Sequence, residues 1–407
     1  MNLPGKNLSG YAWAVVALLW PVAMLNYLDR QMVSSIRSSI RADIPSIAND
    51  QDFGTLMAVF MWVYAFLSPV GGFVADKFNR RWTVIGSLFV WSAVTWATGH
   101  AQTYSQMLAF RATMGISEAF YIPAALALIT DFHTGSTRAK AVGIHQSGIY
   151  VGLALGGIGG YIAQTSSWRN CFTWFGLAGV IYAVVLMATL RDVPVSVETK
   201  QNKNVTVAET VRALWSKPAF WILVIYFTLP AIAGWVTKNW LPTYLADTFH
   251  LKEGPAGLSA TGYIQVASLV GVVLGGVIAD WWMRRTARGR IFTSACGVLL
   301  LVPALLGLGY AWSLSAAIGF MILFGLGWGF FDCNNMPILC QIARPEHRAT
   351  GYGFMNLVSI SVGAGATVAL GWMRDQQVKF SVAFAISAAV ALLGAALILL
   401  VKPPAAT

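Results

Sequence analysis

Residues 71–81 read GGFVADKFNRR, and residues 275–285 read GGVIADWWMRR. The two stretches share six residues at the same spacing, namely two glycines, an alanine, an aspartate and two arginines. Each stretch follows a long apolar segment and ends in a basic pair. The repeat therefore predicts a chain built from two related halves.

The chain around these repeats is strongly apolar. Of its 407 residues 57% are hydrophobic and only 11% are charged, and the mean hydropathy is +0.63. Soluble domains carry about 25% charged residues, and a soluble protein as apolar as this one would expose large patches and aggregate. We therefore expect a multi-pass integral membrane protein surrounded by membrane lipid.

Twelve segments are long and apolar enough to cross a membrane, which takes about 20 residues per helix. They lack the alternation of a β-barrel, so we expect an all-α fold of two pseudo-symmetric six-helix halves. The longest polar gap predicts a cytoplasmic linker over residues 191–217, between bundles over 1–190 and 218–407. The expected spans are residues 11–35, 54–75, 82–101, 104–130, 139–164, 169–190, 218–246, 256–282, 290–311, 313–338, 349–372 and 378–401.

The positions of lysine and arginine predict the orientation, because cytoplasmic loops carry an excess of both. With a cytoplasmic N-terminus, 18 of the 27 fall in cytoplasmic segments and six fall outside. We therefore expect both termini in the cytoplasm, and the net charge of +11 requires no nucleic acid. The short loops favour a bacterial inner membrane, and we expect a monomer.

Motifs of membrane enzymes are missing from the sequence. It contains no HExxH, no clustered metal ligands, no nucleotide-binding loop and no Gly-x-Ser-x-Gly turn, and its four cysteines have no CxxC spacing. We expect no enzymatic activity, no metal and no cofactor, and an ion gradient as the energy source.

Charged residues interrupt two of the apolar spans, at Asp29 and Arg30 and at Arg111 and Glu118. An ionised group costs at least about 2.5–3.5 kcal/mol inside the bilayer, so it usually pairs, faces water or binds something. Arg111 and Glu118 are seven residues apart and share one helical face, whereas Asp29 and Arg30 point about 100° apart. These side chains are expected to line a cavity. The alternatives are a buried ion pair with another helix and, for Asp29 and Arg30, an outer position that reaches water.

The repeated GGxxAD followed by a basic pair, after spans two and eight of twelve, resembles the major facilitator superfamily over the whole chain. The resemblance implies a secondary active transporter that works by alternating access. It also implies that the loop aspartate caps a neighbouring helix and that the arginine pair stabilises one conformation; simple positive-inside anchoring is the alternative. Asn79 stands where the family usually has glycine. The loop residues so implied are Gly72, Asp76, Arg80, Arg81, Asp280, Arg284 and Arg285.

Four motifs resemble the anion:cation symporter branch of that family: NYLDR (26–30), FMWVYAFLSPVGG (60–72), RATMGISEAFYIPA (111–124) and WLPTYL (240–245). This resemblance implies proton-coupled symport of a small organic anion, such as a hexuronate or an aldonate. Sodium coupling is one alternative. A second is the spinster-like branch of lipid and lysolipid transporters, which shares close versions of the first and third motifs. WLPTYL favours the anion symporters.

The same resemblance assigns roles to the charged residues. Arg30 is expected to bind the substrate carboxylate with its planar guanidinium, and Arg111 to support the site. Asp29 and Glu118 are expected to carry protons, because burial disfavours the charged form of a carboxylate. The other expected substrate-binding residues are Tyr27, Tyr64, Tyr121, Gln146, Lys238, Trp240, Asn334, Asn335 and Asn356.

Two of these positions depart from the branch. Its span-five glutamine falls at Ile149, and Gln146, about one turn away, is the substitute. Lys238 either adds a second positive charge for an anion or reaches to water. The polar run 332–335 predicts a water-lining face or a break in span ten.

Glycines and prolines predict where the helices pack closely and bend. Span five carries glycine at 148, 152, 156, 157, 159 and 160, which allows close helix approach. Proline bends helices, and kinks are expected at Pro123, Pro230, Pro242 and Pro337.

Overall fold

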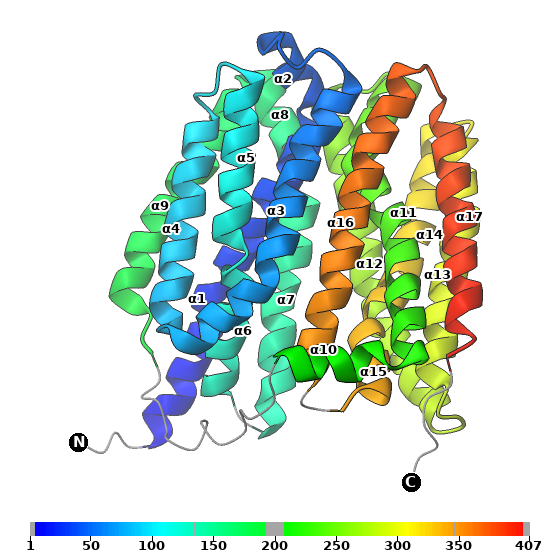
Figure 1. Cartoon of the computed structure of the whole chain (residues 1–407). Helices are drawn as coiled ribbons and strands as arrows, with labels where there is room; N and C mark the ends of the chain where they lie inside the picture. Colours follow the sequence, from blue (N-terminus) through cyan, green and yellow to red (C-terminus); the bar gives the residue numbers. More distant parts are fainter. Residues whose placement is uncertain (1–4, 134, 193–206, 345–346, 402–407) are drawn as a thin grey trace. The chain divides into compact units, whose positions relative to one another are not determined.

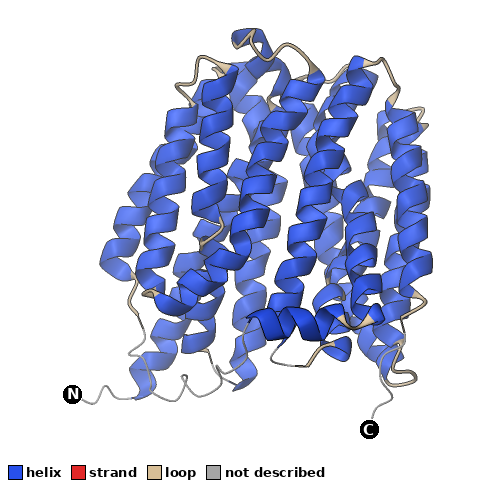
Figure 2. Cartoon of the chain, viewed as in Figure 1, coloured by secondary structure: helices blue, strands red, loops and turns tan. Residues whose placement is uncertain are grey.

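The computed structural model describes residues 5–133, 135–192, 207–344 and 347–401, and these residues form helices and connecting loops without any strand (Figures 1 and 2). The expected all-α fold is thereby confirmed. The helices are α1 (Gly5–Met32), α2 (Arg37–Asp43), α3 (Asp50–Lys77), α4 (Arg80–Thr98), α5 (Tyr104–Glu118), α6 (Tyr121–Phe132), α7 (Arg138–Leu155), α8 (Ile158–Thr165), α9 (Trp168–Thr189), α10 (Val207–Trp215), α11 (Pro218–Phe249), α12 (Glu253–Met283), α13 (Gly289–Gly309), α14 (Leu314–Asp332), α15 (Asn335–Ile342), α16 (Arg348–Asp375) and α17 (Phe380–Ile398).

Eleven helical runs within the described residues are long and apolar enough to cross a membrane. The remaining expected span, residues 82–101, falls on α4. That helix is not among the eleven because its two arginines and its hydroxyl side chains lower its mean hydropathy. With α4 included, a helical run lies at each of the twelve expected spans.

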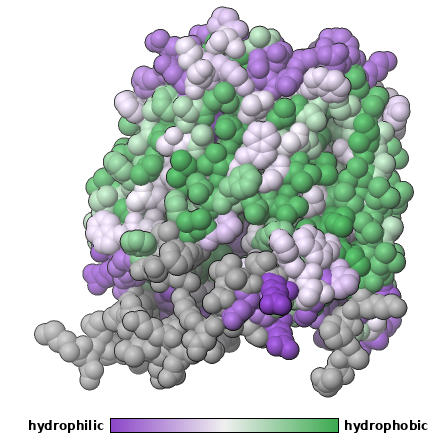
Figure 3. Space-filling model, viewed as in Figure 1, coloured by the Kyte–Doolittle hydropathy of each residue, from purple (hydrophilic) through white to green (hydrophobic). Residues whose placement is uncertain are grey.

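The surface of the helices suits a bilayer. Figure 3 shows hydrophobic side chains along the middle of the helices and hydrophilic ones near their ends. Large apolar side chains such as Ile181, Val273 and Leu393 are exposed. A lipid environment tolerates such a surface, whereas water does not.

The chain forms two compact units. Unit 1 comprises Met1–Ala48, Val59–Lys200 and Lys252–Leu258, and unit 2 comprises Asn49–Ala58, Gln201–Leu251 and Ser259–Thr407. Each unit thus includes the first turns of one helix from the other half of the sequence. Of the expected linker, residues 193–206 lie outside the described residues, and part of the remainder forms α10.

Ion pairs and backbone contacts explain why the start of α3 belongs to unit 2. Arg374 donates from Nε to Asp50 Oδ2 at 2.7 Å and from Nη2 to Asp247 Oδ2 at 2.6 Å. The Asp375 carboxylate accepts from the backbone N–H groups of Asp50 and Gln51, each at 2.9 Å. The first N–H groups of a helix have no partner within it, so Asp375 caps α3.

Three spans are interrupted, between α5 and α6, between α7 and α8 and between α14 and α15. At the first and the third a proline follows the break, Pro123 in α6 and Pro337 in α15. A proline ring clashes with the carbonyl four residues earlier, which is that of Ala119 or Cys333, the residue at which each break begins. Pro230 and Pro242, by contrast, lie inside the continuous α11.

Glycines bring α7 close to α1 in unit 1. A Cβ atom on Gly152 would collide with the carbonyl oxygen of Met24, and one on Gly148 would lie 2.8 Å from that of Trp20. The Trp20 indole also donates to Ser147 Oγ at 3.1 Å. The close approach expected from the glycine spacing is confirmed.

We expect Gly152→Ala to destabilise unit 1, because overpacking a tight contact costs about 1–3 kcal/mol. Thermal unfolding of the purified protein in detergent would show this as a lower midpoint temperature. Gly143→Ala is the matched control, since Gly143 lies on the same helix and has no atom within 4 Å of an added Cβ. Equal midpoints for the two variants would contradict the assigned packing.

Candidate functional site

Four ionisable side chains gather in the interior of unit 1, from α1 and α5. Arg30 Nε donates to Glu118 Oε2 at 2.5 Å. Glu118 is fully buried, Asp29 is 2% exposed and Arg111 is 3% exposed. The Arg30 side chain is 11% exposed. Arg30 is therefore engaged inside the unit, and a buried ion pair joins the two motifs that interrupt the spans.

Aromatic rings surround the two guanidinium groups. The Arg30 guanidinium carbon lies 4.3 Å from the ring centre of Tyr64, 4.6 Å from that of Tyr27 and 5.0 Å from that of Phe60. The Arg111 guanidinium lies 4.6 Å from the same Phe60 ring. Cation–π contacts contribute about 2 kcal/mol or more when desolvated, so Phe60 stabilises both positive charges.

Phe60 was not singled out as a site residue from the sequence. It stacks on Tyr64 with ring centres 6.0 Å apart and planes 18° apart. Side chains four residues apart lie on one helical face. This spacing from an expected site tyrosine was the signal that could have identified Phe60.

Several polar atoms of the cluster have no hydrogen-bond partner among the described residues. They are Asp29 Oδ1, Arg30 Nη2 and Glu118 Oε1, all buried, and the buried Asn26 amide lies close enough to Glu118 to interact with it. The second oxygen of Asp29 accepts a long bond of 3.4 Å from Thr95 Oγ1. An unsatisfied buried polar group costs about 1–3 kcal/mol. The cluster therefore has unused capacity for a proton, a water molecule or a polar ligand.

Tyr121 takes part in a different contact in unit 1. Its hydroxyl donates to the Leu19 carbonyl oxygen at 3.0 Å and lies 2.9 Å from His145 Nε2. Because the tyrosine proton points to Leu19, the His145 Nε2–H donates to the hydroxyl oxygen. The other ring nitrogen, Nδ1, has no partner within the described part of the chain. Gln146, next in sequence, is exposed.

In unit 2, Lys238 is held between indole rings. Its Nζ lies 4.1 Å from the ring centre of Trp328 and 5.8 Å from that of Trp235. Asp332 is near enough to interact electrostatically with it. Trp328 packs against Gly234, where a Cβ would collide with the ring. Lys238 thus has defined partners inside the unit.

The other expected residues of unit 2 differ in whether their polar atoms already form hydrogen bonds. Trp240 is fully buried, and its indole N–H donates to the Thr367 carbonyl oxygen at 3.0 Å. Asn334 and Asn335 are buried at the α14–α15 break, and Asn335 has no side-chain partner among the described residues. Asn356 is partly exposed on α16. The Asn334 amide nitrogen donates to the Phe330 carbonyl oxygen at 2.9 Å, so the break places one free amide group, that of Asn335, inside unit 2.

The arginines of the first repeated loop contact neighbouring helices. Arg80 pairs with Asp131, and Arg81 Nη2 donates to the Met187 carbonyl oxygen at 2.5 Å. Gly72 and Asp76 lie on α3, and their side chains are outside the described part of the structure. The capping role expected for Asp76 therefore stays a prediction.

The second repeated loop uses its charges differently. Asp280 pairs with Arg290 at 2.8 Å, five residues beyond the repeated arginines. The Arg285 guanidinium lies 4.0 Å from the Trp281 ring centre, and Arg284 is exposed. In this loop the basic pair itself stays at the surface of unit 2.

Comparison with known proteins gives matches along nearly the whole chain. Residues 8–368 match the family model described as the Major Facilitator Superfamily. Protein spinster of Drosophila melanogaster is 26% identical over 90% of this chain, which spans only 62% of the fly protein. The hexuronate transporter of Bacillus subtilis is 24% identical over 96% of this chain and 94% of its own.

A solved structure resembles the fold. It is a bacterial homolog of the human lysosomal transporter Spinster, determined in an inward-facing, unoccupied conformation. The TM-score is 0.80 with 20% sequence identity, covering 97% of this chain and 99% of that one. The nucleoside transporter NupG gives a TM-score of 0.77 at 12% identity. At these identities the likeness concerns the fold.

Proposed function

Because the chain belongs to the major facilitator superfamily of membrane transporters, we propose that it carries a small organic anion together with protons, by alternating access. The proposed substrate class is the sugar acids, such as hexuronates and aldonates. The observation that carries this proposal is the buried Arg30–Glu118 pair, with unused polar atoms on both side chains. The similarity to a hexuronate transporter over nearly its whole length supports it.

The pair offers a direct way to couple an anion to a proton. In this structure, Glu118 neutralises Arg30. Leaving either charge buried without a partner costs about 3–5 kcal/mol. A substrate carboxylate can replace Glu118 on Arg30 if Glu118 takes up a proton at the same time. Anion and proton then bind together, because either one alone leaves a buried charge uncompensated.

The remaining expected residues differ in how well their contacts fit the proposed roles. Tyr27 and Tyr64 pack on the Arg30 guanidinium, so an anion bound there would meet both. Asp29, buried with one free oxygen, is the proposed second proton carrier. Lys238 is the proposed second positive charge for the anion. Trp240 is better suited to packing, because its N–H is already donated to Thr367.

An uptake assay with purified protein in liposomes tests the proposal. Labelled glucuronate, galactonate, glucose and a lysophospholipid would be offered with and without an inward proton gradient. We expect gradient-driven uptake of an acid and no uptake of glucose. Uptake that follows a sodium gradient instead would retain the anion as the substrate and make sodium the coupling ion. No uptake of either acid would overturn the proposal.

Lysolipid transport is the second candidate function, and similarity to spinster proteins favours it. In that case only the lysophospholipid would enter the liposomes. The Arg30–Glu118 pair would then hold α1 against α5 without binding cargo. We further propose that the protein is a monomer in a cytoplasmic membrane. The distribution of lysine and arginine supports an orientation with both termini inside.

We expect Phe60→Leu to lower the efficiency of acid uptake about tenfold, because it removes cation–π contacts to both Arg30 and Arg111. The effect should appear as a higher KM in the liposome assay. Phe89→Leu is the matched control, since Phe89 is an exposed phenylalanine on α4. Unchanged uptake by Phe60→Leu would show that the aromatic contacts of Phe60 do not contribute to transport of the acid.

A further inference from the structure

A chain of hydrogen bonds joins three helices of unit 1 beside the α5–α6 break. The hydroxyl group of Tyr121, the first residue of α6, donates to the Leu19 carbonyl oxygen of α1 at 3.0 Å. His145 Nε2 on α7 lies 2.9 Å from the same hydroxyl oxygen and donates to it. Tyr121 and His145 are both fully buried. Because a tyrosine hydroxyl carries a single proton, the donor capacity of Tyr121 is fully used by α1.

The ring of Tyr121 is also in contact with neighbouring helices. The fully buried Trp91 ring of α4 meets it edge-on, with ring centres 5.5 Å apart and planes 69° apart. The His145 ring lies 6.0 Å away on the α7 side. Edge-to-face aromatic pairs add to the stability gained from burial. Tyr121 is therefore better suited to holding α6 in place than to binding cargo.

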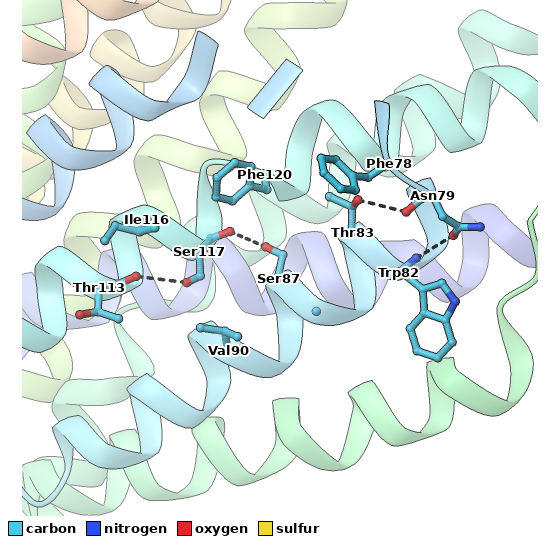
Figure 4. Close-up of a pocket in the computed structure, with 11 residues that line it drawn as sticks. Phe78, Asn79, Trp82, Thr83, Ser87, Val90, Thr113, Ile116, Ser117 and Phe120 are labelled. Carbon is cyan, nitrogen blue, oxygen red and sulfur yellow. Dashed lines mark hydrogen bonds between the residues drawn. The ribbon is translucent and has the colours of Figure 1, made fainter. Parts of the chain in front are cut away.

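The α5 side of the break is fixed to α4. Ser87 Oγ donates to the Ser117 carbonyl oxygen at 2.5 Å, one residue before the end of α5 (Figure 4). Glu118 is the last residue of α5, and Tyr121 follows it by three residues. The backbone groups at a helix end lack partners within the helix. Glu118 thus lies where the helix is interrupted, and between two anchored points.

The broken span contacts α1 at two places. Leu19 accepts from Tyr121, and Arg30 pairs with Glu118. When Glu118 takes up a proton and releases Arg30, the contact at Leu19 remains. We propose that His145 is a positioning residue, which acts through Tyr121 to hold the break on α1 so that Glu118 returns to Arg30 after each proton exchange. This role rests on the proposed function, because it takes Glu118 as the proton carrier.

His145 can be changed without disturbing other polar contacts. Its Nδ1 atom is buried and has no hydrogen-bond partner in the part of the chain that the structure describes. Its Nε2 atom bonds to Tyr121. The polar effect of a substitution at this position is therefore transmitted through the tyrosine hydroxyl.

Tyr121→Phe removes the hydroxyl group and keeps the ring. In the liposome assay we expect gradient-driven accumulation of acid to fall about fivefold, as for the loss of one net hydrogen bond. The KM for counterflow should stay unchanged, because Arg30 is untouched. Tyr182→Phe is the matched control, since the Tyr182 hydroxyl on α9 donates to the neighbouring α1 carbonyl oxygen, that of Leu18, at 2.8 Å. Equal losses in the two variants would overturn the proposal.

Variants of His145 test whether it acts through Tyr121. We expect His145→Leu to lower accumulation as much as Tyr121→Phe does, and the double variant to lower it no further. His145→Gln keeps an N–H near the place of Nε2 and should restore accumulation to about the wild-type level. Additive losses in the double variant, or equal losses in His145→Leu and His145→Gln, would contradict the assigned role.

Hydrogen exchange of the whole protein in detergent measures the anchoring separately from transport. We expect the amides of residues 117–121 to exchange about fivefold faster in Tyr121→Phe than in the wild type or in Tyr182→Phe. If the wild type carried neither acid and this difference appeared, the proposed function would fail and the anchoring of the break would stand. Unchanged exchange at the break would overturn the positioning role, whatever the transport result.

Discussion

Arg30→Ala is expected to lower acid uptake into liposomes by at least a hundredfold. The variant removes the proposed carboxylate-binding group and leaves Glu118 fully buried without its partner. Loss of one member of a buried pair costs about 3–5 kcal/mol, and each 1.4 kcal/mol is a factor of ten in binding. Initial rates at several glucuronate concentrations would measure the effect.

Two further variants separate binding from folding. Arg138→Ala removes an exposed arginine of the same unit and should transport normally. The double variant Arg30→Met with Glu118→Gln removes both charges, so it should unfold at nearly the wild-type temperature and still fail to take up acid. Normal uptake by Arg30→Ala, or by the double variant, would rule out Arg30 as the anion-binding group.

Glu118→Gln is expected to abolish gradient-driven accumulation while preserving exchange of acid across the membrane. The amide has nearly the shape of a protonated carboxyl group, so Arg30 would be released for the substrate. An amide cannot lose the proton that the cycle must deliver, and the coupling therefore disappears. Accumulation under an inward proton gradient would fall to the level without a gradient. Counterflow of labelled acid in preloaded liposomes would continue.

Asp43→Asn is the matched change for this experiment. Asp43 is an exposed carboxylate that pairs with Arg169 at 2.9 Å in the same unit. Exposed ion pairs contribute about 0–1 kcal/mol, so accumulation by this variant should equal that of the wild type. Continued accumulation by Glu118→Gln would assign proton coupling to another group, with Asp29 the next to test.

The sequence predicted the helices well because membrane spans have a strong local signal. Hydropathy located even α4, whose arginines reduce its mean value. The breaks near Ala119 and Cys333 follow from Pro123 and Pro337. Kinks were expected at four prolines, however, and the sequence did not indicate which of these prolines would interrupt a helix. Only the three-dimensional packing shows that α11 stays continuous through its two prolines.

The charged residues of the candidate site could be named from the sequence, but their contacts could not. The energetic cost of buried charge singled out Arg30 and Glu118, but they are 88 residues apart in sequence, and no local pattern pairs them. The same holds for the start of α3, which joins unit 2 through Arg374 and Asp375. Phe60 was missed because its four-residue spacing from Tyr64 is a weak signal in an apolar span, and its cationic neighbours are known only from the structure.

Proton movement during acid uptake tests the central claim most directly. Liposomes would contain the protein and a pH-sensitive dye, and glucuronate would be added outside without any initial gradient. We expect internal acidification that depends on the acid and disappears in Glu118→Gln. Entry of labelled glucuronate at a normal rate with no change in internal pH would contradict proton coupling through the Arg30–Glu118 pair.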